Sequence, residues 1–438
     1  MFCLDHRQDL TVQALRRHIE SDAKLIELFA TAFSEIPEEF LDRSKHIGPA
    51  HIRDYSALLD NIDQVIQTVP SWTSAVEQNC VIACPMNEVL QRQTSDLLMF
   101  NSKIWFMNTR TGSDILARKD INAHFYAILQ RWGQYLASAR SAKAIHSGQG
   151  GWVSAGALTE LLDVVVHAHN TTFRPASFAE AFICDPSLPS YGFHSWDDFF
   201  TRRFRPGMRP VAGPEDDRII ANPCESQPFA LVKNVPASAH FSLKGTVYSL
   251  QDMLGDGNDT TTAQPSAIFT GGTVFQAWLS AFSYHRWHAP VTGTVVNVLN
   301  LRGTYFAADP AKGFENVDPA TKASCPDRQA PDLSLTMISS TATRTAVLIQ
   351  ADNPALGTVG FLAIGMADVS SCVATVAVGD RVAKGQEIGS FHYGGSSFCL
   401  LFEPGVDLTF SPFVEDALAQ DPGYEGRCIA VNSQLAAL

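Results

Sequence analysis

The stretch from Val376 to Phe402 reads VAVGDRVAKGQEIGSFHYGGSSFCLLF, and it sets the fold of the second half of the chain. The Gly-Asp pair at position 379 supplies a turn, and the flanking Val and Ile residues alternate as in a half-buried strand. Strand-like runs follow at Glu387–Phe391 and Phe398–Phe402, on either side of a Gly-Gly-Ser-Ser segment. This pattern predicts β-strands joined by tight turns.

The same alternation of apolar runs with Gly, Pro and Asn/Asp turns begins near residue 215. The segment from Asp309 to Leu333 is rich in Pro and Asp and predicts a long loop. Other strands are expected at Arg218–Ile220, Phe229–Lys233, Ala267–Phe269, Val295–Leu301, Ala346–Gln350 and Val359–Ile364.

The first 170 residues have the apolar spacing of helices instead. Helical periodicity covers Leu10–Phe33 and Asp114–Ser138, and Ser154 is placed to cap a third helix that ends near Asn170. We therefore predict an α+β protein. Its helical N-terminal region spans residues 1–170 and its strand-rich domain spans residues 171–438.

Composition restricts the classes of function. The chain has 438 residues, a net charge of −13 and a pI near 5.4, which argues against nucleic acid as the main partner. We find no signal peptide and no apolar run of the ~20 residues that span a bilayer, so a soluble, cytoplasmic protein is expected. The nine Cys residues are scattered, with Cys80 and Cys84 the only close pair, which favours free thiols.

The segment Gly394-Gly395-Ser396-Ser397 is the first candidate for chemistry. Such a tetrad is often only a flexible turn, but two flanking strands can hold it in a strained form. The glycines would let the Ser396 hydroxyl face the carbonyl of Gly395. Attack would form an ester in place of the peptide bond, and elimination across the Cα–Cβ bond of Ser396 would release the upstream chain. The dehydroalanine that remains would take up water and lose ammonia, which leaves a pyruvoyl group at residue 396. This chemistry needs a nearby base.

Two histidines and a glutamate are candidates to assist. His285 and His288 could bind a metal, pack in the core, or transfer protons near neutral pH. Glu225 could be solvated, as most glutamates are, or could orient the base. The residues alone leave these alternatives open.

Five segments of the chain form a recognisable series: Trp196–Arg203, Arg209–Val211, Lys244–Leu250, Tyr284–Pro290 and the Gly-Gly-Ser-Ser segment. In this order they resemble the phosphatidylserine decarboxylase proenzyme family. The N-terminal region, notably Asn108–Gly112 and the helix after it, is similar to a fungal branch of this family that includes pyruvoyl-dependent tryptophan decarboxylases.

A second resemblance concerns only a fold element. The segment APVTGTVVNV, from Ala289, and the segment VAVGDRVAKGQEIG, from Val376, together resemble the two hairpins of lipoyl- and biotinyl-type carrier domains. The modifiable Lys of those carriers has no convincing equivalent here, which weakens a carrier function.

The family resemblance implies roles for the candidate residues. It implies a pyruvoyl cofactor made from Ser396, cleavage after Gly395, His288 as the base of self-cleavage, and His285 as a group linked to decarboxylation. Glu225 stands where the family usually has Asp. Ser397 stands where the family has Thr, which leaves it as an outside candidate for the reactive serine. No metal is implied.

We therefore expect a self-cleaving pyruvoyl-dependent decarboxylase made of its own large and small chains. A free aromatic amino acid, tryptophan first, is the expected substrate. Phosphatidylserine is the alternative substrate, and a non-catalytic carrier or binding module is the alternative of another class.

Overall fold

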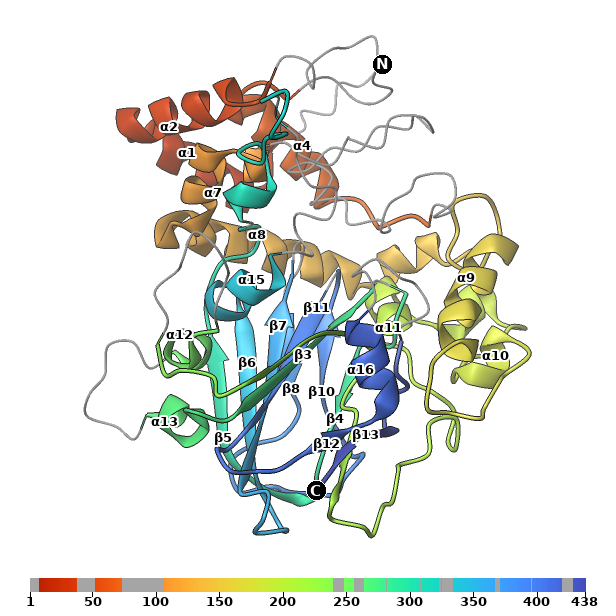
Figure 1. Ribbon diagram of the computed structural model, residues 1–438. Coiled ribbons are helices and arrows are strands. Elements are labelled where there is room, and N and C mark those ends of the chain that lie inside the picture. The colour runs from red at the N-terminus through yellow and green to blue at the C-terminus, as the bar shows by residue number, and fades with distance from the viewer. Residues whose placement is uncertain are drawn as a thin grey trace.

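The computed structural model describes residues 8–37, 52–72, 106–238, 248–255, 264–280, 282–307, 309–322, 324, 334–366, 371–394, 396–419 and 428–438. Its centre is an antiparallel seven-stranded sheet with the order β2-β3-β11-β7-β6-β5-β9 (Figure 1). The strands in that order are Gln227–Lys233, Thr273–Leu279, Ser396–Phe402, Thr358–Gly365, Arg344–Ala351, Gly293–Leu301 and Arg381–Val382.

Two three-stranded sheets pack on one face of the large sheet. Apolar side chains fill the space between them, including Trp287, Phe361, Phe391 and Phe398. One small sheet has the order β4-β10-β8, with strands Arg286–His288, Glu387–His392 and Ser371–Ala374. The other has the order β1-β13-β12, with strands Ile219–Ala221, Gln434–Ala437 and Thr409–Phe410, and helix α16 (Pro412–Leu418) follows β12.

Helices cover the opposite face of the large sheet. Leu362, Cys399 and Leu401 point to this side and pack in one cluster with apolar residues of three short helices. These helices are α12 (Leu250–Leu254), α13 (Pro265–Phe269) and α15 (Leu335–Thr341).

The strand predictions hold with one exception. Five of the six upstream runs are strands, and the two runs around the Gly-Gly-Ser-Ser segment form β10 and β11. The predicted strand Ala267–Phe269 is wrong, because Pro265 starts helix α13 at a position where its fixed φ favours a helix. The two segments that resemble carrier-domain hairpins, which start at Ala289 and Val376, lie side by side because β5 pairs with β9.

The N-terminal region is helical as predicted, although two of the expected helices are broken. The segment Leu10–Phe33 divides because Asp22 caps a new helix, and the segment Asp114–Ser138 divides at the extended residue Arg118. Ser154 caps the third helix through its hydroxyl, as expected. The helices are α1 (Leu10–Glu20), α2 (Ala23–Ser34), α4 (Tyr55–Val65), α7 (Arg110–Ala117), α8 (Lys119–Leu136) and α9 (Ala155–Val166).

Shorter helices complete the described structure. They are α10 (Phe178–Ala181), α11 (Trp196–Phe200) and the 3-10 turns Phe106–Asn108, Ala139–Ala144, Pro189–Gly192 and Pro310–Lys312. The 3-10 turn at Pro310 and a bridge between Val317 and Ser324 lie within the predicted loop from Asp309 to Leu333.

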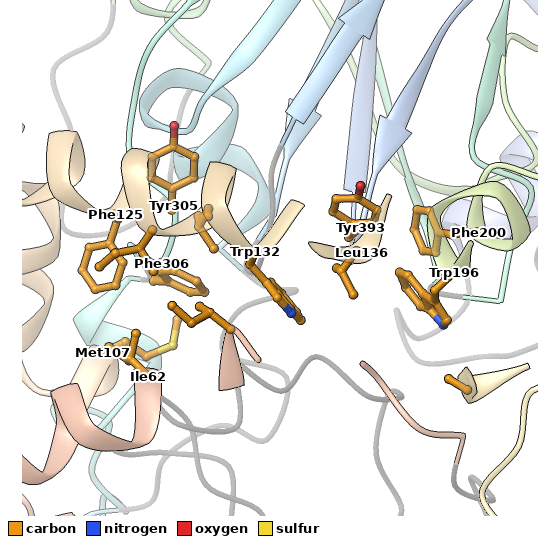
Figure 2. Close-up of a cluster of buried hydrophobic side chains, with 14 of the residues drawn as sticks. Ile62, Met107, Phe125, Trp132, Leu136, Trp196, Phe200, Tyr305, Phe306 and Tyr393 are labelled. Carbon is orange, nitrogen blue, oxygen red and sulfur yellow. The ribbon is translucent and has the colours of Figure 1, made fainter. Parts of the chain in front are cut away.

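Helix α8 lies across the strand ends near β7 and β11, with helices α1, α2, α4 and α7 beyond it (Figure 1). Its Trp132 and Leu136 belong to one buried cluster with Trp196, Phe200 and Tyr393, as Figure 2 shows. This cluster crosses the predicted boundary at residue 170. The helical region and the strand-rich region therefore share a core.

In the ranges described above, no helix is long and apolar enough to cross a membrane. The described cysteines are free thiols: Cys184, Cys224, Cys372, Cys399 and Cys428. The pair Cys80 and Cys84 lies outside the described residues.

Replacing Trp132 with Ala tests this shared core. The indole is fully buried, and its Nε1 donates to the Thr68 carbonyl at 3.0 Å. Truncating a buried Trp typically costs about 3–5 kcal/mol, so we expect a loss of that size in the free energy of unfolding measured with urea. Gln134→Ala, at an exposed position of the same helix, is the control and should change the free energy of unfolding by less than about 0.5 kcal/mol. Equal stability of both variants would show that the helical layer packs loosely.

Candidate active site

Ser396 is the first residue of β11, the strand between β3 and β7. Its side chain points to the same face as Phe398 and Leu400, toward the small sheets, because side chains alternate along a strand. The residue is 1% exposed, and its Oγ has no hydrogen-bond partner among the described residues. Gly395, the predicted cleavage position, lies outside the described residues.

Ser397 points to the opposite face of β11. Its Oγ lies 3.5 Å from Nε2 of Gln276, and the oxygen of the Gln276 amide accepts a hydrogen bond from Tyr248. The hydroxyls of the two serines therefore occupy different environments, one without a partner and one facing a polar network.

His285 lies just before β4. It is at the end of the small sheet where β10 leaves toward Ser396. Its carbonyl accepts a hydrogen bond from the Phe391 amide at 2.9 Å. The imidazole is fully buried and stacks on the Phe200 ring, with centroids 4.0 Å apart and an interplanar angle of 15°. His285 thus belongs to the aromatic surroundings of the Ser396 segment.

His288 pairs with Glu387 in β10 and lies three residues farther along the chain than His285. Trp287 between them faces the large sheet, so alternation directs the His288 ring to the outer face of the small sheet. Its Nε2 lies 3.0 Å from the Tyr284 hydroxyl, and its Nδ1 lies 2.7 Å from the Gly385 carbonyl. Burial lowers the pKa of His288, so the neutral ring is favoured.

Glu225 is fully buried, so its interpretation as a solvated glutamate is wrong. Its carboxylate forms a two-pronged ion pair with Arg209 and accepts a hydrogen bond from the Val431 amide at 2.8 Å. The carbonyl of Pro223, two residues before Glu225, accepts a hydrogen bond from the His288 amide at 2.9 Å. Glu225 is therefore tied to the base candidate through the backbone of the Pro223–Glu225 segment.

The sequence missed three residues that gather at the turn before Ser396. Asp197 of α11 contacts His392 across 195 positions of sequence, and Tyr393 follows His392. All three occur in motifs quoted above, and the acidic pair in Trp-Asp-Asp is the sequence feature that could have drawn attention to α11.

Within the segments that the structure describes, no group of three or more His, Cys, Asp and Glu side chains is placed to hold a metal ion.

Comparisons with known proteins identify the family of the chain. Residues 196–418 match the family described as phosphatidylserine decarboxylase, and residues 9–161 match a second family of that description. The chain is 39% identical to "Decarboxylase iboD" of Amanita muscaria over 333 residues, which is 76% of this chain and 88% of that protein.

Two proteins from Psilocybe species are also similar, and both are called L-tryptophan decarboxylase. The one from Psilocybe cubensis is 37% identical over 67% of this chain and 65% of its own length. The one from Psilocybe cyanescens is 34% identical over 80% of this chain and 79% of its own length. One family model matches half of this chain, and the alignment to a relative that is 39% identical covers 88% of that relative. This chain is therefore a decarboxylase that belongs to the phosphatidylserine decarboxylase family.

Proposed function

We propose that this protein cleaves itself after Gly395, converts Ser396 into a pyruvoyl group, and decarboxylates a free aromatic L-amino acid, tryptophan first. The observation that carries the proposal is the buried Ser396 hydroxyl, which has no hydrogen-bond partner among the described residues and starts the central strand. Cleavage would leave a large chain of residues 1–395 and a small chain of residues 396–438.

The surroundings of Ser396 fit a pyruvoyl group. An unpartnered hydroxyl is available as a nucleophile, and the apolar face of β11 around it limits the access of bulk water. A pyruvoyl group supplies an electron-accepting carbonyl for the amine substrate, the role that other enzymes give to a bound cofactor. Pairing of residue 396 with Leu279 and Gly365 holds this position from both sides.

The two histidines would divide the proton transfers. We assign the base of self-cleavage to His288 on the family resemblance, and its lowered pKa keeps the ring neutral and able to accept a proton. Among the described residues no hydrogen bond joins His288 to Ser396, and the His288 ring contacts Tyr284 and Gly385 instead. We assign to His285 the transfer of the proton that replaces carbon dioxide on the substrate. His285 is buried among the aromatic residues at the Ser396 end of the small sheet. Glu225 would position the segment that holds the His288 backbone.

The substrate assignment follows the relatives and the setting of the site. Two relatives are called L-tryptophan decarboxylase, and their similarity extends into the helical region. Aromatic side chains surround the turn before Ser396: the Trp196 and Phe200 rings lie 5.8 Å and 6.1 Å from the Tyr393 ring. Such surroundings suit an aromatic amino acid. Phosphatidylserine stays as the second candidate, because both matching family descriptions name it.

Ser396→Ala should abolish cleavage and decarboxylation together, because it removes the nucleophile and the precursor of the pyruvoyl group. Ser397→Ala should cleave at close to the normal rate, since that hydroxyl faces Gln276 on the other side of β11. Intact-mass analysis of the purified proteins distinguishes residues 1–395 and 396–438 from the full chain. The opposite behaviour of the two variants would move the reactive position to Ser397.

The pH dependence of cleavage tests His288. Its burial lowers the pKa, so cleavage should keep its rate down to the ordinary value of 6.5 and decline only at lower pH. His288→Ala should cleave about 10²–10⁴ times more slowly, whereas His285→Ala should cleave but decarboxylate poorly. Timed gels at a series of pH values give the rates. A decline centred above pH 6.5, or normal turnover by cleaved His285→Ala, would contradict these roles.

A direct competition identifies the substrate. The cleaved enzyme is mixed with tryptophan, other amino acids and phosphatidylserine vesicles, and the products are resolved by mass. We expect tryptamine to form fastest and without lipid. Phosphatidylethanolamine as the sole product would establish the second candidate and keep the pyruvoyl chemistry.

A further inference from the structure

A chain of hydrogen bonds lies beside the turn that leads into Ser396. The Nδ1 atom of His392 lies 2.8 Å from Oδ1 of Asp197, and its Nε2 lies 3.1 Å from Oγ of Ser390. The phenol of the next residue, Tyr393, has two acceptors within reach, the Gly133 carbonyl of α8 at 3.2 Å and the Asp197 carboxylate. Asp197 therefore contacts two consecutive side chains of the turn.

The order Asp–His–Ser is that of a hydrolase triad, but the setting differs. Ser390 is 5% exposed and lies inside strand β10, between β4 and β8. With so little of Ser390 exposed, an acyl substrate cannot reach its hydroxyl in this conformation. These hydrogen bonds therefore serve to hold His392 and Tyr393 rather than to form a second nucleophile.

Asp197 is itself well anchored. It lies in the first turn of α11, where Ser195 caps the helix through the Asp198 amide at 3.1 Å. The Trp196 amide donates to Oγ of Ser141 at 2.8 Å. The carboxylate thus projects from an element fixed to the helical layer.

The backbone of the turn explains why such an anchor is needed. Tyr393 has a φ of 64° and Gly394 has a φ of 93°, so two consecutive residues are left-handed. Glycine adopts this conformation readily, but Tyr does so at an energetic cost. Contacts of the Tyr393 side chain must offset that cost if the turn is to persist.

We propose that Asp197 is a positioning residue for self-cleavage, which holds His392 and Tyr393 so that the left-handed turn before Ser396 is maintained. This inference rests on the proposed function. In this role Asp197 acts through the turn and does not touch the substrate.

The test follows cleavage of the freshly synthesised full chain by timed intact-mass analysis. Asp197→Ala should slow cleavage about 5–30-fold, the factor that matches the cost of one left-handed non-glycine residue. Asp198→Ala removes the neighbouring carboxylate, which accepts a hydrogen bond from the His194 amide. This control variant should cleave at the normal rate. Thermal unfolding of both variants shows whether either has lost its fold.

A combination with Tyr393→Gly separates positioning from general stability. Glycine has no left-handed cost, so adding Asp197→Ala to Tyr393→Gly should slow cleavage less than about 2-fold. Cleaved Asp197→Ala protein should also decarboxylate with normal kcat. Asp197→Asn, which keeps the size of the side chain, replaces Asp197→Ala in both experiments if the alanine variant unfolds.

The outcomes are distinct. Normal cleavage by the Asp197 variant, or equal slowing with and without Tyr393→Gly, would overturn the positioning role while leaving the proposed function intact. Absence of cleavage in the unmodified chain would instead overturn the proposed function.

Discussion

Strand β11 is hydrogen-bonded along both edges and buried on both faces, and the rest of the structure is arranged around it. All its residues from Ser396 to Phe402 are buried, between β3 and β7 within the sheet and between apolar clusters above and below it. A strand in this position cannot shift by one residue without moving every side chain to the other face. This constraint gives the two adjacent serines their different environments.

The helical layer closes the open end of this sheet. Helix α8 contacts the strand-rich region through Tyr393 and Gly133, and also through Gln130 and Ser371, whose side chains lie 3.3 Å apart. Its apolar face joins the cluster that reaches Trp196 and Phe200. The N-terminal region therefore contributes directly to the walls around the reactive segment. Residues 9–161 match a second family of the same description. The shared core shows how this region and the strand-rich region form one structure.

The buried charged side chains in the described ranges are paired or hydrogen-bonded, which keeps the polar groups of the site in fixed places. The ion pair of Arg209 and Glu225 is almost fully buried, and removal of one partner of such a pair typically costs about 3–5 kcal/mol. Glu387 is held between Arg286 and Arg203. Although burial alone would raise the pKa of Glu387, the two guanidinium groups lower it. This charged layer covers the outer face of the small sheet, where the His288 ring lies.

The sequence by itself determined the α+β class, most strands, the cap at Ser154 and the presence of a strand on each side of the Gly394-Gly395 pair, because alternation, turn residues and caps act locally. Only the tertiary structure decided that β11 begins at Ser396, that Glu225 is paired with Arg209, and that His285 and His288 face different surroundings. It also brought Asp197 to His392 across the chain. These features depend on which strands become neighbours and in what register, and that outcome is set by burial of the whole core rather than by any single segment.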